Sequence, residues 1–136
     1  MLTPEHFSRA MATEKAMYRA LTDLEELTGE LAQAANRNDR VSLRMYLSLR
    51  QEPLEQLAQH KAALDRQCAS LPEPDGRMLR ELLNQPSPPA CPGSEELVRQ
   101  VARTRALWER VVRADRQISL KLTGSSSFYN KEKPAL

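Results

Sequence analysis

Aromatic residues and glycine are both scarce in this sequence of 136 residues. There are one Trp, three Tyr and two Phe, together 4% of the chain, and only four Gly. Leu, Ala, Glu, Gln and Arg dominate instead, and these residues favour long helices over packed sheets. The composition therefore predicts an all-α protein, and the length predicts a single domain with a modest core.

Long apolar segments are missing as well. No stretch of 18 apolar residues occurs, and the opening residues MLTPEHFSRAMATEK lack a basic region followed by an apolar one. We therefore expect no membrane insertion and no signal peptide. Cys68 and Cys91 have no CxxC spacing, so free thiols in a reducing cytoplasm are expected. The net charge of only +2 does not favour nucleic acid as a partner.

Residue patterns of catalysis are absent too. His6 and His60 are the only histidines, neither ends a Glu-x-x-His motif, and there is no Gly-rich phosphate loop or nucleophile elbow. We therefore expect neither enzyme activity nor a cofactor. A zinc site formed by both histidines with Cys68 and Cys91 stays open as an alternative, although the spacing matches no structural zinc module.

Three long helices are predicted from the apolar spacing, and the first covers about residues 4–36. Thr3 suits an N-cap and Pro4 the first helical position. At 1.5 Å per residue the helix is roughly 45 to 50 Å long. One face of it carries apolar residues three or four apart, namely Met17, Leu21, Leu24, Leu27, Leu31 and Ala35.

The second helix is predicted over about 39–71, with Asn38 or Asp39 as its cap. Pro53 lies inside the pattern and predicts a kink at 51–53, because proline removes one backbone hydrogen bond while the repeat keeps its phase. The repeat alternates spacings of four and three, as in a heptad seam with two charged interruptions. Its members are Leu43, Leu47, Arg50, Leu54, Leu57, Lys61, Leu64, Cys68 and Leu71.

A proline-rich connector over 72–93 separates this helix from the third, which is predicted over about 94–123. The connector holds six of the nine prolines and one apolar patch at 78–83, which predicts a short helix that docks on the core. Ser94 suits the N-cap of the third helix and Gly124 its end. The seam of this helix comprises Leu97, Val101, Thr104, Trp108, Val111, Asp115, Ile118 and Leu122.

The short first loop and the long connector predict an elongated antiparallel bundle, with the third helix packed along the first two. Charge agrees with this arrangement. Residues 5–35 include six acidic and three basic side chains, whereas 97–121 include seven basic and two acidic ones. We therefore expect the first and third helices to be neighbours, and we use the charges as evidence of register because each surface pair adds little stability.

A second apolar ridge on the second helix is the most informative surface feature. Val41, Met45 and Leu49 stand four residues apart, away from the seam. In one interpretation this ridge is internal, and in the other it is an exposed surface that binds an amphipathic partner helix. Val112 and Ile118, on the exposed side of the third helix, are the candidate client contacts on that helix.

Several stretches resemble the FlgN-type flagellar export chaperones. They are the turn NRNDRVSL, the leucine repeat YLSLRQEPLEQLAQHKAAL, and the helix end RADRQISLKL followed by SSSFYNK. The resemblance implies a cytoplasmic helical protein that binds the C-terminal amphipathic helices of hook-associated proteins and brings them to the export gate. In that family a tyrosine just after the last helix is implicated in docking on an export-gate component, and Tyr129, beside Phe128, occupies the matching place.

The residues 124–136 are expected to form a flexible tail, in which an aromatic pair provides contact area for a partner at small entropic cost. The alternative is that Phe128 and Tyr129 fold back on the open end of the bundle. For the whole chain, the alternatives to a chaperone are a self-associating coiled-coil adaptor and a nucleic-acid binder that uses the basic third helix. We expect a monomer or a weak homo-oligomer.

Overall fold

The structure, a computed structural model, describes residues 1–123, and every regular element in that range is an α-helix. The predicted all-α class is therefore confirmed. The predicted tail, with Phe128 and Tyr129, lies outside the described residues. The helices are α1 (Pro4–Asn36), α2 (Arg40–Leu49), α3 (Gln51–Ser70), α4 (Asp75–Asn84) and α5 (Glu95–Thr123).

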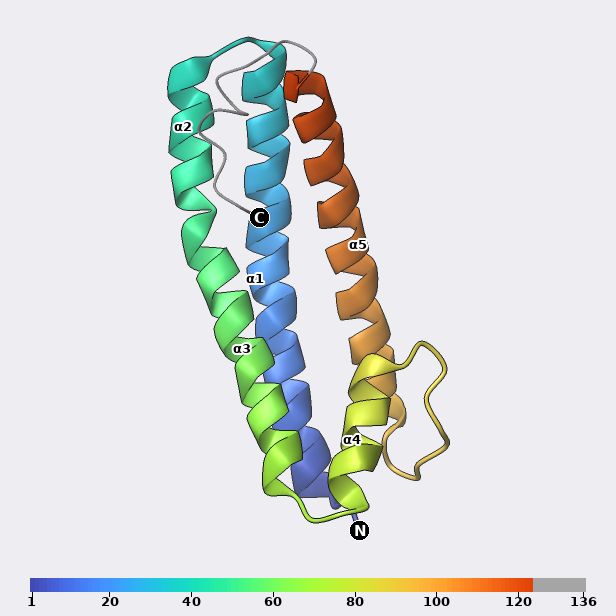
Figure 1. The fold of residues 1–136 in the computed structure, drawn as a ribbon. Helices are drawn as coiled ribbons and strands as arrows, with labels where there is room; N and C mark the ends of the chain where they lie inside the picture. The colour runs from blue at the N-terminus through green and yellow to red at the C-terminus, as the bar shows by residue number, and fades with distance from the viewer. Residues whose placement is uncertain (124–136) are drawn as a thin grey trace.

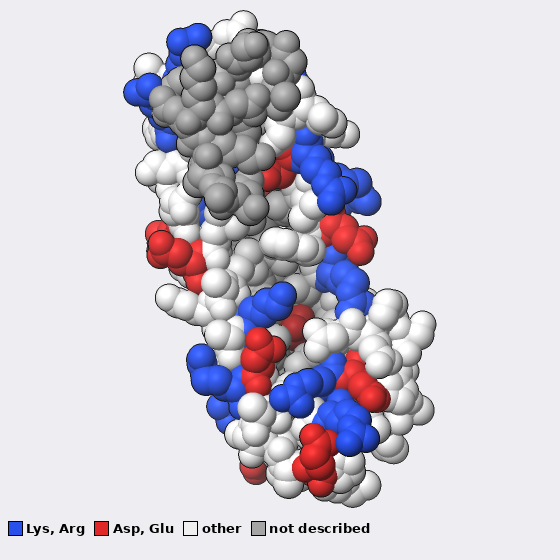
Figure 2. Space-filling view, viewed as in Figure 1, with Lys and Arg blue, Asp and Glu red and all other residues white. Residues whose placement is uncertain are grey.

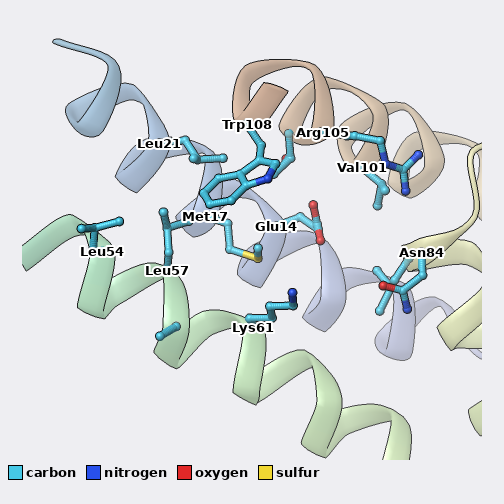
Figure 3. Close-up of a pocket in the computed structure, with 13 residues that line it drawn as sticks. Glu14, Met17, Leu21, Leu54, Leu57, Lys61, Asn84, Val101, Arg105 and Trp108 are labelled. Carbon is cyan, nitrogen blue, oxygen red and sulfur yellow. The ribbon is translucent and has the colours of Figure 1, made fainter. Parts of the chain in front are cut away.

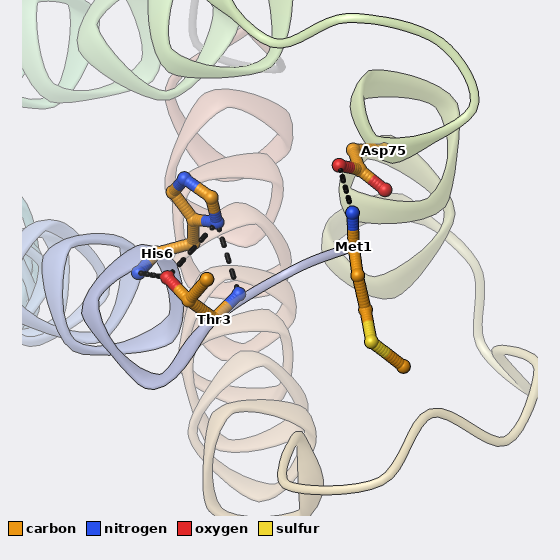
Figure 4. A network of polar contacts seen from close by, with 4 residues as sticks. All are labelled: Met1, Thr3, His6 and Asp75. Carbon is orange, nitrogen blue, oxygen red and sulfur yellow. Dashed lines mark hydrogen bonds and ion pairs between the residues drawn. The ribbon is translucent and has the colours of Figure 1, made fainter.

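The start of α1 is capped as the sequence predicts. The Thr3 side chain accepts a hydrogen bond from the His6 backbone N–H at 3.4 Å, and the His6 Nδ1 accepts one from the Thr3 N–H at 3.0 Å (Figure 4). Nearby, the N-terminal ammonium of Met1 forms an ion pair of 2.7 Å with Asp75 of α4 (Figure 4). His6 therefore has a capping role at this helix end.

The turn between α1 and α2 is closed by Asp39, which is one of the two predicted caps. Its carboxylate accepts hydrogen bonds from the Ser42 backbone N–H at 3.1 Å and the Ser42 hydroxyl at 2.7 Å. These bonds lower the pKa of the Asp39 carboxyl below its ordinary value. The other predicted cap, Asn38, adopts a positive φ of 56°, a conformation that asparagine tolerates in turns.

Where the sequence analysis expects one kinked helix over 39–71, the structure has two helices separated by Arg50 alone. Pro53 lies in the first turn of α3 and has no N–H to donate to the carbonyl of Leu49. The ladder resumes with a hydrogen bond from the Leu54 N–H to the Arg50 carbonyl at 3.2 Å. The proline thus gives a physical reason for the interruption at this place.

The helix α4 lies in the proline-rich segment and docks on α3 at a close approach. A Cβ atom added to Gly76 would lie 2.7 Å from the backbone carbonyl oxygen of Cys68, so glycine is required for this packing. Leu79, Leu82 and Leu83 of α4 are buried. Ser94 precedes α5, but its hydroxyl donates to the Cys91 carbonyl at 2.7 Å.

Figure 1 shows α1 along the whole length of the molecule, with α3 and α5 on either side of it, α2 at one end and α4 at the other. Glu25 of the acidic α1 and Arg110 of the basic α5 form an ion pair of 3.1 Å, in agreement with the predicted pairing of these helices. The core is a column of three clusters along α1. Its buried members include Phe7, Leu64, Leu79, Leu97 and Val101 at the α4 end, Leu21, Leu24, Leu57, Leu107 and Val111 in the middle, and Leu31, Ala35, Leu43, Ile118 and Leu122 at the α2 end.

Candidate functional site

A long groove runs between α3 and α5, with α1 as its floor. Each of these two helices packs extensively on α1, but they scarcely approach each other directly. At one end α4 lies between them and packs on both (Figure 1). Beyond Asn84, the last residue of α4, the position between α3 and α5 is open, and two adjoining hollows occupy it. We call these two hollows together the α3–α5 groove.

The lower hollow, next to α4, has a volume of about 450 Å³. Figure 3 shows Met17 and Leu21 of α1 facing Leu54 and Leu57 of α3, with the Trp108 indole of α5 beside them. Trp108 is 45% exposed, although it lies on the predicted seam of its helix. Large apolar side chains with this much exposed area are typical of contact sites for another apolar surface.

The upper hollow is larger, about 690 Å³, and shares Leu54 and Trp108 with the lower one. It extends along α5 past Val112 to Leu120, which is 73% exposed. Its lining is mainly apolar, apart from Arg50, Asp115, Arg116 and Ser119. The two hollows therefore form one apolar strip bordered by a few polar groups.

Glu14 is the unusual polar group of the lower hollow. Its side chain is only 4% exposed, and its Oε1 atom is buried without a hydrogen-bond partner. Burial raises the pKa of the Glu14 carboxyl above its ordinary value, while a hydrogen bond with Thr104 and the charge of Arg105 act in the opposite direction. Figure 3 shows this carboxylate between Lys61 of α3 and Arg105 of α5.

Arg50 and Asp115 form the polar group of the upper hollow. The Arg50 Nη1 atom lies 3.1 Å from Asp115 Oδ1, and the side chains are 5% and 19% exposed. Arg50 is one of the two charged residues in the predicted seam of the second helix, and Asp115 is the charged residue in the predicted seam of the third. Both charged side chains line the upper hollow. The Arg50 Nε atom is buried without a hydrogen-bond partner.

The predicted ridge on α2 is exposed. Val41 is 81% exposed, and Met45 and Leu49 are about half exposed. The structure thus favours the surface interpretation of this ridge over the internal one. The ridge is a second apolar surface, since none of its three residues lines either hollow of the α3–α5 groove.

The two predicted client contacts on α5 have different positions. Val112 is half-buried and lines the upper hollow of the groove. Ile118 is buried in the core beside Leu31 and Leu43, so the expectation that it lies on the exposed side of its helix is wrong. Its place on the seam, four residues before Leu122, is the signal that it faces inward. Phe128 and Tyr129 lie outside the described residues.

Several groove residues escaped the sequence analysis as site residues. On α5, Trp108, Arg116 and Leu120 were not named as site residues. With the predicted Val112 they stand four apart, in a row that leaves the seam at Trp108 and that a search for a second apolar face would find. Glu14 continues the seam of α1 toward its N-terminus, three residues before Met17. A carboxylate at a core-facing position is the signal there.

Metal and membrane sites have no support in residues 1–123. No three His, Cys, Asp or Glu side chains in that range are placed to hold a metal ion, and His6 caps α1 instead. None of the helices in the same range has the length and apolarity needed to cross a membrane. Figure 2 shows acidic and basic side chains interspersed along this face, without a continuous basic surface.

A comparison of the chain with models of protein families, with curated proteins and with solved structures found no match.

Proposed function

We propose that this protein is a non-enzymatic chaperone that binds an amphipathic helix of a client protein in the α3–α5 groove. The observation that carries the proposal is the incomplete bundle. The helices α3 and α5 both pack on α1, yet within residues 1–123 the position between them is filled only by α4, at one end. An apolar helix laid in the open part would complete a four-helix arrangement.

The dimensions of the groove suit a helix. From Val101, at the α4 end of the lower hollow, to Leu120, in the upper hollow, α5 covers roughly 28 Å at about 1.5 Å per residue. A client helix of about 19 residues would match this length. It would bury the exposed faces of Trp108 and Leu120, as helix-in-groove recognition requires.

The helix α4 supports this mode of binding because it already occupies the same position. Its Leu79, Leu82 and Leu83 are positions i, i+3 and i+4 of one helix face. They are buried where α4 packs between α3 and α5. A client helix with apolar residues at similar intervals would continue the row that α4 begins. The chain thus contains an example of the ligand that the groove would accept.

The resemblance to the FlgN-type chaperones makes the proposal more specific. The clients would be hook-associated proteins of a flagellum, bound through their C-terminal helices in the cytoplasm before export. Phe128 and Tyr129 would then serve the export-gate component. The exposed ridge of Val41, Met45 and Leu49 offers a second contact surface for the client, which is one of the two interpretations that the sequence leaves open.

The test is direct binding between the full chain and each purified hook-associated protein of the same organism, with and without its C-terminal helix. We expect binding that requires this helix and that Trp108→Asp abolishes. The variant Gln59→Asp introduces the same residue at an exposed position of α3 and is the control. It should bind the client as the unaltered chain does. Equal binding of the truncated clients, or no binding to any of them, would contradict the proposal.

Self-association is the second candidate function, and the exposed ridge on α2 is the observation that favours it. The seams themselves are less suited to a coiled-coil dimer, because Leu43, Leu57 and Leu64 are buried within the chain. Sedimentation equilibrium of the full chain over a wide concentration range separates the two candidates. A stable dimer that the Val41→Asp substitution dissociates would support self-association as the function.

A further inference from the structure

Glu14 is an acidic residue at a core-facing position, and its neighbours satisfy its carboxylate only in part. It lies on the core-facing side of α1, between the buried Ala10 and the half-buried Met17, where an apolar residue would normally be expected. Its Oε1 atom is buried without a partner, and a carboxylate left in this state destabilises the free protein. A group held at such a cost inside a binding groove is a candidate recognition element.

We propose that Glu14 recognises a carboxamide side chain, Asn or Gln, on the apolar face of the helix that binds in the α3–α5 groove. The inference rests on the proposed function and states which partner that groove prefers. The bound carboxamide would supply the hydrogen bond that Oε1 lacks. A buried polar pair of this kind fixes the register of one helix on another, since a shift by one turn leaves both groups unpaired.

The charges around Glu14 argue for a neutral partner group. Lys61 and Arg105 line the same hollow from opposite walls, so a cationic side chain entering it would meet two like charges (Figure 3). An acidic side chain would meet the Glu14 carboxylate itself. A carboxamide avoids both, and because it both donates and accepts, it pairs with the carboxyl group in either protonation state.

Two long side chains, Lys61 and Arg105, flank the Glu14 carboxylate (Figure 3). Lys61 is exposed and Arg105 is half-buried, and both have long flexible stems. A helix that settles on Met17 and Leu57 would move these stems outward while their charged ends stay in water. Acidic residues at the borders of the client helix would then pair with Lys61, Arg105 and, in the upper hollow, Arg116.

The position of Glu14 also predicts where the carboxamide lies on the client. Asn84, at the C-terminal end of α4, lines the same hollow as Glu14. The carboxamide should therefore occur near the end of the client helix that abuts α4. The remaining positions on the apolar face of the client helix, which we call its ridge positions, would face Trp108 and Leu120. They should be apolar, because the upper hollow has mainly apolar lining.

The experiment is a selection from a displayed library of 19-residue amphipathic helices, a length taken from the groove at about 1.5 Å per residue. Acidic residues are fixed at the borders, and each ridge position varies among Leu, Asn, Gln, Glu and Lys. The baits are the full chain, its Glu14→Leu variant and the matched control Glu26→Leu, which makes the same exchange at an exposed position of α1.

On the unaltered chain and on Glu26→Leu we expect Asn or Gln to be enriched at one ridge position near a helix end. On Glu14→Leu we expect Leu at that position. In a selected helix, replacement of the carboxamide by Leu should weaken binding to the unaltered chain about tenfold and should not weaken binding to Glu14→Leu. Should Glu14→Leu fail to fold, Glu14→Gln replaces it and should keep the carboxamide preference, because two amides can pair.

The remaining outcomes overturn the inference in distinguishable ways. Leu at every ridge position on the unaltered chain, with binding that Trp108→Asp abolishes, would leave the groove as a helix site and remove the role of Glu14. Lys at the critical position would mean that Glu14 binds a cation. A photo-crosslink from a benzophenone at position 108 to residues 124–136, or to a second copy, would assign the groove to that occupant. Failure of all helices to bind, together with failure of the hook-associated proteins, would overturn the proposed function as well.

Discussion

Arg50 and Asp115 form an ion pair of 3.1 Å that joins the break between α2 and α3 to α5. Both residues are charged positions in mainly apolar heptad seams, and the structure pairs them with each other. A buried pair contributes little net stability compared with apolar side chains of the same volume, but removal of one partner leaves the other uncompensated. The pair therefore favours the register of α5 in which Asp115 lies beside Arg50.

Removal of Arg50 alone should destabilise the protein. We expect Arg50→Met to lower the free energy of unfolding by about 2 kcal/mol, less than for a fully buried pair because Asp115 is 19% exposed. The double variant Arg50→Met with Asp115→Leu should lie within about 1 kcal/mol of the unaltered chain. Urea denaturation of the unaltered chain, of Arg50→Met, of Asp115→Leu and of the double variant measures the coupling. A double variant less stable than either single variant would show that the pair is not coupled.

Glu14 should make stability depend on pH. Its pKa is raised in the folded protein above the ordinary value of 4.5, so the folded state binds more protons than the unfolded state just above that value. The stability of the unaltered chain should therefore fall as the pH rises from about 4.5 through the folded pKa. Well below pH 4.5 the Glu14 carboxyl is protonated in both the folded and the unfolded state, so this loss of stability is absent.

Glu14→Gln removes the ionisation and should remove that part of the pH dependence. We expect the variant to gain stability relative to the unaltered chain as the pH rises from 4 to 7.5, as measured by thermal unfolding at matched ionic strength. Glu26→Gln, at an exposed position of α1, is the control and should follow the unaltered chain. A difference between Glu14→Gln and the unaltered chain that does not change with pH would contradict the account.

Gly76 should tolerate no side chain. Its missing Cβ would lie 2.7 Å from the Cys68 carbonyl oxygen, which belongs to the backbone and cannot move without displacing α3. We expect Gly76→Ala to lower the free energy of unfolding by about 2 kcal/mol. Gly29→Ala, at a helical site where nothing lies within 4 Å, should instead be neutral or stabilising. Equal stability of the two variants would mean that α4 does not approach α3 so closely.

The α2 ridge should matter for binding and not for folding. Val41→Asp with Met45→Asp changes two exposed side chains, so we expect native helicity by circular dichroism and an unchanged melting temperature to within a few degrees. Client binding should be lost if the ridge contacts the client. A folded double variant that binds its client undiminished would restrict the client site to the α3–α5 groove.

Composition predicted the all-helical class. Periodicity predicted most of the core, because apolar residues three and four apart on a helix share a face whatever the neighbours are. It could not predict that Trp108 and Ile118, both on one seam, would differ in exposure. Ile118 packs among residues of α1 and α2, whereas Trp108 lines the hollow between α3 and α5. The difference depends on which neighbours a face meets, and that is a property of the assembled fold.

The groove itself was beyond sequence reasoning for the same reason. It exists because α4 is only as long as Asp75–Asn84 and fills one end of the space between two longer helices. The prolines that follow α4 explain why it stops, but the space left open becomes apparent only after α3 and α5 are placed on α1. Glu14 likewise becomes notable only through its buried and unpartnered Oε1 atom.

Fluorescence of Trp108 reports directly on whether a client helix binds in the α3–α5 groove, because Trp108 is the only tryptophan in the chain and lies half exposed in that groove. The full chain is titrated with a tryptophan-free peptide of the C-terminal helix of a hook-associated protein, and binding is measured in parallel by calorimetry. If the peptide binds in the groove, the Trp108 emission should show a saturable blue shift and protection from acrylamide quenching. Both changes should have the same midpoint as the calorimetric titration. Binding heat with unchanged Trp108 emission and quenching would contradict binding in the groove.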